Sequence, residues 1–347
     1  MNKIQRKTLF IGIISFFTLC LAPSFAFSLP RTKDNTSTPS ATLSKTSPEM
    51  AFPPSATQIT DDAKPLPETP ESAQTASPAE CGFMPCIPLM PLPTETVYTV
   101  KSDAVSLKSQ ASHWGIKLKQ ILTLNPHLNA DSMLNSGDKI LVDKRHSDGL
   151  AAISKGKANK GRLLNARPMP EGNGYFLRDH RPASWGTDTM IQSLITVFDA
   201  YSKAFPDAPR INIGDLSRQR GGKLHPHKSH QSGRDIDFGF VHQNNDDDVA
   251  KQRFTRAARA NLDVEKTWFL VEQLARTGNV EVIYVDNLVQ KLLYQYASSR
   301  LTPEQREFFF SLPRHSQSSN ALLRHWPGHR NHFHVRFKCP TGQPSCR

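Results

Sequence analysis

Two groups of histidines in the second half of the chain carry residue types that bind metal ions. The stretch "HPHKSHQSGRDIDF", residues 225–238, places three histidines within six positions and follows them with two aspartates. A second group, "HWPGHRNHFH", spans residues 325–334. Nine of the 13 histidines lie between His225 and His334, a clustering not expected of scattered core histidines. Imidazole and carboxylate groups are ligands that zinc accepts, so the clusters indicate metal chemistry.

Two expected strands would each place their possible metal ligands on one face of a sheet, because side chains alternate in direction along a strand. If residues 235–241 form a strand, its two aspartates point to one face, and the residues between them point to the other. The same holds for the two histidines that begin a strand over residues 332–337. His230 lies seven positions before Asp237, far enough for a turn to bring it back over the first strand. Two imidazoles and one carboxylate would leave zinc an open tetrahedral position, as in catalytic sites.

The elements that must position these residues interleave irregularly. Apolar residues recur at helical spacing over residues 188–205 and 264–276. Strands are expected over four segments: 210–213, 235–241, 280–285 and 332–337. No glycine-rich phosphate loop joins them. This pattern favours an α+β fold around a mainly antiparallel sheet, in one domain over residues 163–347.

The N-terminus has the composition of a targeting segment. A basic start precedes an apolar run from Leu9 to Leu21, and small residues come before a cleavage site predicted after Ala26. The run is shorter than the ~20 residues that span a bilayer, which argues against the alternative, a membrane anchor. We therefore expect residues 1–26 to be a signal peptide. The mature protein is expected in the periplasm or cell wall, with no stable membrane anchor.

Two segments are predicted to be linkers. Between Pro30 and Pro93 lie 13 of the chain's 26 prolines, mixed with serine, threonine and alanine. Such a stretch buries too little apolar surface to offset its chain entropy. We expect a disordered linker rich in proline, serine and threonine over residues 27–95, and a second, basic linker over residues 144–162.

Four cysteines remain after removal of the signal peptide. They form two close pairs along the chain, and three pairings are possible in principle. Because exported proteins meet an oxidising compartment, the local pairs predict two disulfides, Cys81–Cys86 and Cys339–Cys346.

A small module is expected over residues 96–143. β-branched and aromatic runs stand at its ends, with two helical patterns between them. The words "VYTV", "LNP" and "GDKILV" resemble a LysM domain, a family that binds N-acetylglucosamine-containing glycans such as peptidoglycan. The resemblance implies a strand–helix–helix–strand unit with a glycan-binding groove between the loops near Asp103 and Asn125.

The histidine-rich sequence motifs resemble those of a family of zinc peptidases. "HKSHQSGRDIDF" and "GHRNHFHVRFKCP", together with "GDLSRQRGG" at residues 214–222, are similar to the penicillin-insensitive murein endopeptidases. The wider group shares the motif H-x6-D with a later H-x-H. The resemblance implies that His230, Asp237 and His334 bind Zn²⁺.

The resemblance also implies roles for the other histidines. His332, the first of the H-x-H, is expected to act as a general base or to stabilise the tetrahedral oxyanion. His329 is expected near the metal in a catalytic role. For His227 two roles stay open: it orients another ligand, or it is an additional or alternative ligand.

The net charge of +12 bears on the class of partner. No helix carries the interleaved basic and aromatic residues of a nucleic-acid-binding motif, and export separates the chain from cellular nucleic acid. Peptidoglycan fits better, because its stem peptides carry free carboxylates. Arg220 and Arg234, beside the first motif, are candidates to bind them, the alternative being solvated surface arginines.

The resemblance implies a zinc-dependent DD-endopeptidase that hydrolyses the cross-links between D-alanine and meso-diaminopimelate in peptidoglycan. Such an enzyme needs no serine nucleophile, which would explain insensitivity to penicillin. Two alternatives remain: a zinc D,D-carboxypeptidase or dipeptidase with the same ligands, and a non-catalytic peptidoglycan-binding protein.

Overall fold

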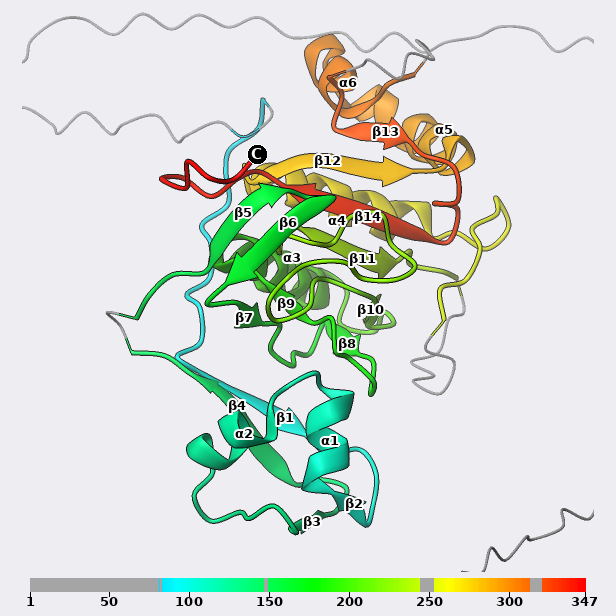
Figure 1. The fold of residues 1–347 in the computed structure, drawn as a ribbon. Coiled ribbons are helices and arrows are strands. Elements are labelled where there is room, and N and C mark those ends of the chain that lie inside the picture. The colour runs from blue at the N-terminus through cyan, green and yellow to red at the C-terminus, as the bar shows by residue number, and fades with distance from the viewer. Residues whose placement is uncertain (1–80, 82, 147–148, 244–252, 313–319) are drawn as a thin grey trace, which may run out of the picture. The chain divides into compact units, whose positions relative to one another are not determined.

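The computed structural model describes most of the chain after its first 80 residues (Figure 1). The described residues are 81, 83–146, 149–243, 253–312 and 320–347. The predicted signal peptide and most of the predicted proline-rich linker lie outside them. Among the described residues, no helix combines the length and the apolarity needed to cross a membrane.

A six-stranded sheet is the centre of the domain that carries the histidines (Figure 1). Its strands are β8 (Tyr175–Leu177), β10 (Ile211–Ile213), β11 (Asp235–Gly239), β12 (Val280–Val285), β13 (Leu323–His325) and β14 (His332–Phe337). They lie in the order β13-β12-β14-β11-β10-β8. The three central pairs are antiparallel, and the two edge pairs are parallel. The expected α+β architecture with a mainly antiparallel sheet is confirmed.

Helices accompany this sheet along the chain. They are α3 (Asp188–Ala204), α4 (Val264–Arg276), α5 (Asn287–Ala297) and α6 (Pro303–Phe309), with a 3-10 turn, η2 (Ser298–Arg300). The first two match the predicted helices to within one residue. Each begins at a capping side chain, Thr187 or Asp263, that accepts a hydrogen bond from the backbone three residues on. The sequence analysis did not predict α5 or α6.

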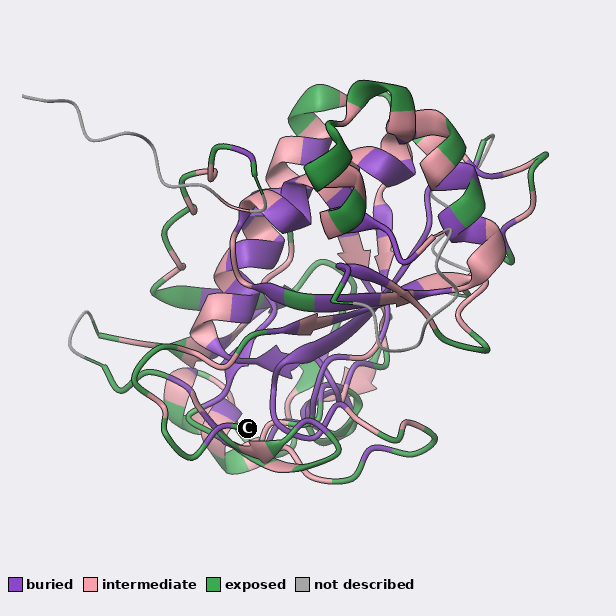
Figure 2. Cartoon of the chain, turned by 90° about the horizontal axis from the view of Figure 1, so that it is seen from above, coloured by how far each residue is buried: buried purple, intermediate pink, exposed green. Residues whose placement is uncertain are grey.

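The core decides which face of the sheet carries the candidate ligands. Ile236 and Phe238 on β11 are fully buried, and the Phe238 ring lies 5.5 Å from that of Phe198 on α3. Figure 2 shows the buried positions following the strands. Because successive strand residues alternate in direction, Asp235 and Asp237 face away from α3.

Residues 95–144 form a small module in which two helices lie between strands, as predicted, with one additional two-residue strand on each side of the helices. Its elements are β1 (Glu95–Thr99), β2 (Val105–Ser106), α1 (Leu107–His113), α2 (Leu118–Leu124), β3 (Met133–Leu134) and β4 (Lys139–Lys144). β1 pairs antiparallel with β4, and β2 with β3. Tyr98 and Trp114, both buried, meet edge to face at 5.4 Å between ring centres in the core of this module.

The module also contacts the histidine-bearing domain. The Tyr98 hydroxyl donates to the Met169 carbonyl at 3.0 Å, and the Arg181 guanidinium lies 4.1 Å from the centre of the Tyr98 ring. Arg181 also donates to Glu171 at 2.9 Å, and its backbone N–H donates to the His113 carbonyl at 2.9 Å. These contacts join the module to the domain independently of the connecting chain.

Residues 83–93, here called the strap, belong to the segment predicted to be a disordered linker, and the prediction is wrong for them. The Ile87 N–H donates to the Arg276 carbonyl at the end of α4 at 3.0 Å, and the Met90 N–H to the Thr196 hydroxyl on α3 at 2.9 Å. Prolines carry no N–H, so the strap needs few backbone partners. Its composition gave no sign that a folded surface supplies them.

The predicted basic linker over residues 144–162 also contains regular structure. A hairpin is formed by β5 (Ile153–Lys157) and β6 (Lys160–Leu164), which pair antiparallel. The Ala158 carbonyl in its turn accepts a hydrogen bond from the Gln231 N–H at 3.0 Å. The linker prediction is therefore wrong here, because backbone pairing compensates for the small apolar content. A short pair, β7 (Arg167–Pro168) and β9 (Trp185–Gly186), follows.

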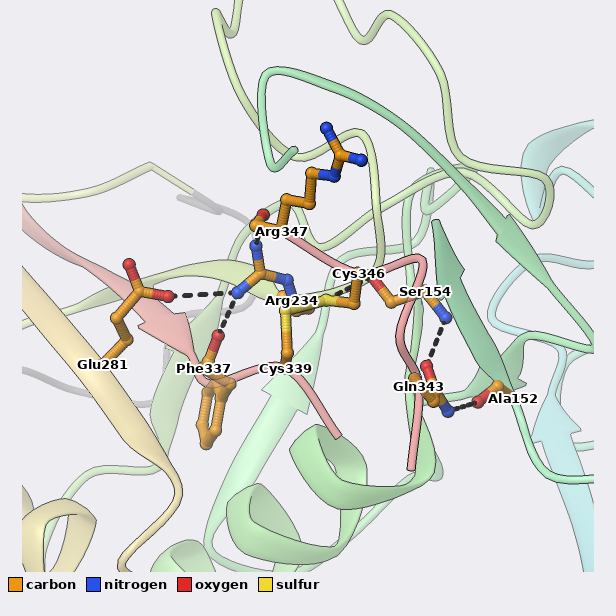
Figure 3. The surroundings of a disulfide bond; sticks show 9 residues. All are labelled: Ala152, Ser154, Arg234, Glu281, Phe337, Cys339, Gln343, Cys346 and Arg347. Carbon is orange, nitrogen blue, oxygen red and sulfur yellow. Dashed lines mark hydrogen bonds and ion pairs between the residues drawn. A yellow bond between two sulfur atoms is a disulfide. The ribbon is translucent and has the colours of Figure 1, made fainter. Parts of the chain in front are cut away.

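Both predicted disulfides are present. Cys81 and Cys86 close the start of the strap, and Cys339 and Cys346 close a loop after β14 (Figure 3). Gln343 inside this loop accepts from the Ser154 N–H at 2.8 Å. The second disulfide thereby holds a segment that is hydrogen-bonded to the β5–β6 hairpin.

Candidate active site

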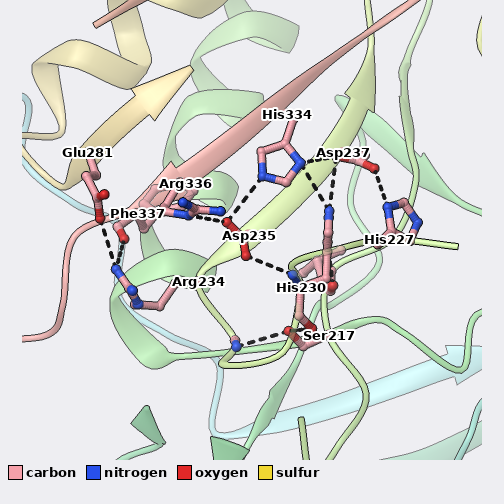
Figure 4. Close-up of polar contacts among 12 residues, drawn as sticks. Ser217, His227, His230, Arg234, Asp235, Asp237, Glu281, His334, Arg336 and Phe337 are labelled. Carbon is pink, nitrogen blue, oxygen red and sulfur yellow. Dashed lines mark hydrogen bonds and ion pairs between the residues drawn. The ribbon is translucent and has the colours of Figure 1, made fainter. Parts of the chain in front are cut away.

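The three predicted metal ligands converge on the polar face of the sheet (Figure 4). Asp237 on β11 is directly opposite His334 on β14 in the antiparallel register. The nearer carboxylate oxygen, Oδ1, lies 3.0 Å from Nδ1 of His334 and 3.3 Å from Nε2 of His230. These two imidazole nitrogens are 3.2 Å apart. Neighbouring strands and a loop therefore bring together residues about 100 positions apart in the chain.

Backbone contacts orient His230. This residue precedes β11 and adopts a left-handed conformation, with φ of 63°. Its Nδ1 lies 2.7 Å from the Leu216 carbonyl, and its backbone N–H donates to Oδ2 of Asp235 at 2.9 Å. An N–H on Nδ1 donates to that carbonyl, so Nε2 keeps its lone pair and faces Asp237.

Asp235 orients His334 from behind. Its Oδ1 lies 3.3 Å from Nε2 of His334 and accepts a hydrogen bond from Nε of Arg336 at 2.7 Å. Burial by itself raises the pKa of Asp235, but the hydrogen bond from His334 and the charge of Arg336 hold that pKa well below its usual value. A carboxylate that fixes the outer nitrogen of a ligating histidine is a common second partner in metal sites.

Charge coupling within the cluster is strong. Burial by itself lowers the pKa of His334, yet the hydrogen bond to Asp235 and the charge of Asp237 raise it to about 9. The pKa of Asp237 is lowered well below its ordinary value, because the charges of the neighbouring His230 and His334 outweigh burial. The ionised, buried carboxylate of Asp237 therefore lies next to two imidazoles, and a metal cation could bind all three groups.

The residues fit a metal ion. Oδ1 of Asp237 is buried and makes no hydrogen bond of good geometry with any described residue, although two imidazole nitrogens lie within 3.3 Å. Leaving such an oxygen unpaired is costly unless a cation takes the place of the hydrogen bond. Nitrogen and carboxylate ligands are the set that zinc accepts in catalytic sites.

His227 lies on the other side of the same carboxylate. Its Nδ1 is 3.4 Å from Oδ2 of Asp237, and its Nε2 is 2.8 Å from Oδ2 of Asp215. Ligand atoms of His227, His230 and Asp237 lie within 4.8 Å of one another. Two ligand sets therefore overlap, and the set with His334 has the shorter contacts to Asp237 and the deeper burial.

His332 and His329 flank the cluster. Nε2 of His332 is 3.9 Å from Oδ2 of Asp237, and its Nδ1 lies 2.7 Å from the side-chain oxygen of Asn331. Burial lowers the pKa of His332 to about 4, so its imidazole is neutral near pH 7. The ring of His329 lies 4.8 Å from that of His332. A neutral imidazole beside the cluster can accept a proton.

Several residues of the site were not identified from the sequence. Asp215 holds His227, and Phe254 stacks on the His332 ring at 4.9 Å between centres. The guanidinium of Arg178 lies 4.7 Å from the centre of the same phenylalanine ring. For Asp235 the spacing of two positions from Asp237 was an available signal. No sequence signal predicted the contacts of Phe254 and Arg178, because these contacts depend on the conformation of loops.

A cleft of about 920 Å³ opens beside the cluster. His227, His329 and His334 line it, together with the paired rings of Tyr284 and Trp326, whose centres lie 5.3 Å apart. The turn of the β5–β6 hairpin and the segment around Lys228 line it as well. A cavity of this size holds a peptide segment rather than a single small ion.

The two arginines predicted to bind substrate have different surroundings in the structure. The side chain of Arg234 is 2% exposed; its guanidinium donates to Glu281 at 3.0 Å and to the Phe337 and Arg347 carbonyls at 2.8 Å each (Figure 3). Arg220 is exposed and lines a different cavity. Arg234 thus lines the cleft beside the cluster, but with its guanidinium bonded to these protein partners, whereas Arg220 lies at the other cavity.

The two residues predicted near the glycan groove differ from each other in burial. Asp103 is exposed and accepts a hydrogen bond from the Ser136 N–H at 2.9 Å. Asn125 is buried, donates to the Ile121 and Leu141 carbonyls at 2.8 Å each, and accepts from the Leu141 N–H. These bonds tie α2 to β4, so Asn125 helps to maintain the fold of the module.

An α+β domain with histidines and an aspartate converging in a cleft defines a candidate metal-dependent hydrolase. Residues 154–347 match the family model of the penicillin-insensitive murein endopeptidases, and the chain belongs to this family. The chain is 28% identical over 204 residues to the penicillin-insensitive murein endopeptidase of Haemophilus influenzae, covering 55% of this chain and 65% of that protein. It is 26% identical over 206 residues to the protein of the same name from Yersinia enterocolitica, covering 54% and 66%. The chain thus spans just under two thirds of the length of these relatives.

Proposed function

We propose that this protein is a zinc-dependent murein DD-endopeptidase that hydrolyses the cross-link between D-alanine and meso-diaminopimelate. The observation that carries the proposal is the buried Asp237 carboxylate, whose Oδ1 lies within 3.3 Å of His230 and His334 without a good hydrogen bond. Family membership supports the same reaction class. The names of the two relatives supply the substrate class, peptidoglycan.

Three residues would hold the metal: His230 through Nε2, His334 through Nδ1, and Asp237. A zinc ion held by these ligands would polarise the scissile carbonyl and acidify water, so no serine nucleophile is required. Asp235 and the Leu216 carbonyl fix the two imidazoles in the tautomers that this assignment needs. His227, held by Asp215, would orient Asp237 from its other oxygen.

His332 would move the proton. Its neutral imidazole lies at the edge of the cluster, so it can take a proton from water and pass it to the leaving amine. His329, the ring beside it, would act at the same stage. Phe254 restricts the rotation of His332 by stacking on it. In hydrolysis the amide C–N bond breaks, a C–O bond to water forms, and the leaving nitrogen gains the proton.

Digestion of purified peptidoglycan tests the reaction. The zinc-loaded full chain is expected to convert cross-linked dimers into two monomers, which mass spectrometry of the muropeptides would identify. Release of free D-alanine without loss of dimers would support the D,D-carboxypeptidase or dipeptidase instead. Binding to peptidoglycan without any new product would support the non-catalytic alternative.

We further propose that the module over residues 96–143 is a LysM domain that binds the glycan strands. Its strand–helix–helix–strand order supports this proposal. Export to the periplasm or cell wall would bring the module and its substrate together. The two disulfides, which suit an oxidising compartment, support that location.

Substitution of Asp103 tests the glycan site. Asp103→Ala is expected to weaken binding to insoluble peptidoglycan about 5-fold, the effect of one ordinary hydrogen bond. Lys119→Ala, at an exposed residue near the start of α2 and outside both loops of the proposed groove, is the control and should bind as the unaltered chain does. Co-sedimentation with sacculi measures both. Equal binding by all three proteins would remove Asp103 from the groove.

A further inference from the structure

The cleft beside the metal-type cluster has an excess of positive charge. Five lysine and arginine side chains line it, whereas Glu281 is its one acidic lining residue among those described. Glu281 pairs with the buried Arg234 at 3.0 Å. The remaining cations include Lys157, Lys228 and Arg336. A cleft lined in this way favours an anionic ligand.

Arg336 is the cation that the sheet places next to the candidate metal ligands. In the antiparallel register it lies opposite Asp235, one two-residue step from the pair of His334 and Asp237. Residues two apart on a strand share a face and lie ~7 Å apart. A single oxygen, Oδ1 of Asp235, contacts both Nε2 of His334 and Nε of Arg336. The guanidinium and the candidate ligand His334 are therefore held by the same atom (Figure 4).

The guanidinium is fixed but not saturated. Nε donates to the fully buried Asp235 at 2.7 Å, and the group lies 5.8 Å from the centre of the Tyr284 ring. No hydrogen bond joins its two terminal nitrogens to another described residue. Lys157 and Lys228, by contrast, are exposed. A fixed arginine with free terminal nitrogens can bind a carboxylate through two parallel hydrogen bonds, which a lysine cannot reproduce.

We propose that Arg336 binds the free carboxylate of the residue that leaves on hydrolysis, and so selects cross-links in which that carboxylate is ionised. This inference rests on the proposed endopeptidase function. In the leaving diaminopimelate, the carboxylate is attached to the carbon that bears the scissile nitrogen. Standard bond lengths put it within about 4 Å of the scissile carbonyl carbon. A substrate whose carbonyl lies at the cluster can therefore bring this carboxylate within reach of Arg336, which is one two-residue step along β14 from His334.

The experiment compares two substrates in two proteins. The substrates are a cross-linked muropeptide dimer with the free carboxylate and the same dimer with that carboxylate converted to an amide. For the unaltered, metal-loaded chain, amidation is expected to lower kcat/KM about 10- to 100-fold, as for loss of a charge-assisted, paired hydrogen bond. Arg336→Gln is expected to lower kcat/KM on the free dimer by a similar factor and to abolish the discrimination.

Two further variants control the comparison. Lys228→Gln removes another cleft cation and should keep the full discrimination. Because Arg336 also pairs with Asp235, metal content is measured for each variant. If Arg336→Gln loses metal or fails to fold, Arg336→Lys replaces it; the single ammonium should keep the metal and reduce the discrimination severalfold.

The possible results distinguish a failure of the Arg336 role from a failure of the endopeptidase function. Cleavage of both dimers by the unaltered chain at equal rates would overturn the role of Arg336 and leave the endopeptidase function intact. The same amidation effect in the unaltered chain and in the folded Arg336 variant would also overturn it, as would loss of discrimination in Lys228→Gln alone. Failure of the metal-loaded chain to cleave either dimer would overturn both proposals.

Discussion

Replacing Asp237 by alanine is expected to remove most of the bound metal and, with it, the activity. The Oδ1 of Asp237 faces the inner ring nitrogens of both His230 and His334, and it is a buried oxygen left without a good hydrogen bond among the described residues. The loss of metal affinity should exceed the ~10- to 100-fold typical of an outer partner. Elemental analysis after dialysis and dimer cleavage measure the two effects.

Two comparisons make this prediction specific. Asp235→Asn alters the residue that orients His334 without contacting the metal position, so its loss of affinity should be smaller, within that range of ~10- to 100-fold. Asp237→Asn retains the size of the side chain, and circular dichroism would show whether each variant folds. Full metal occupancy with full activity in Asp237→Ala would refute the ligand assignment.

His332→Ala is expected to keep the metal and lose turnover by about 10²- to 10⁴-fold, the effect of removing an acid-base group. The ligand at His334 remains, and His332 lies 3.9 Å from Asp237, farther than His230 or His334. With its pKa near 4, the imidazole is neutral over the range in which murein hydrolysis would be assayed. Single-turnover cleavage at saturating substrate measures the loss in the chemical step.

A second histidine variant provides the control. His325 belongs to the same histidine group, but its Nδ1 accepts a hydrogen bond from the backbone N–H of Asn287 at 3.1 Å, at the start of α5. His325→Ala should therefore change stability more than turnover. Loss of metal in His332→Ala would make His332 a ligand and exchange its role with that of His334.

The strands and the cluster were the most predictable parts of the molecule. In residues 235–241 and 332–337, apolar residues alternate with possible metal ligands, so the sequence indicated both a core face and a ligand-bearing face. The observed strands pair with Asp237 opposite His334. The order of residues along the chain does not give strand order, so the register that makes Asp235 the neighbour of Arg336 came only with the structure.

The sequence was least informative where backbone contacts decide the structure. The strap and the β5–β6 hairpin have the composition of linkers, yet each is fixed by hydrogen bonds to distant segments, such as Ile87 to Arg276 and Gln231 to Ala158. Arg234 shows the converse. A charged residue beside a catalytic motif suggested a surface role, but its guanidinium is buried among carbonyls and Glu281.

The β5–β6 hairpin has a consequence for how such an enzyme can diversify. Its turn lines the cleft at Lys157, Ala158 and Asn159, while the candidate ligands lie on β11, β14 and the loop before β11. The Ala158 carbonyl in that turn accepts a hydrogen bond from the Gln231 N–H, next to the candidate ligand His230, so insertions or deletions there would change the width of the cleft and the position of that ligand together. Substrate size and ligand placement are therefore coupled at this turn, and a laboratory selection for wider or narrower cross-links would begin with side-chain substitutions at Lys157 and Asn159, which leave the Ala158 carbonyl in place.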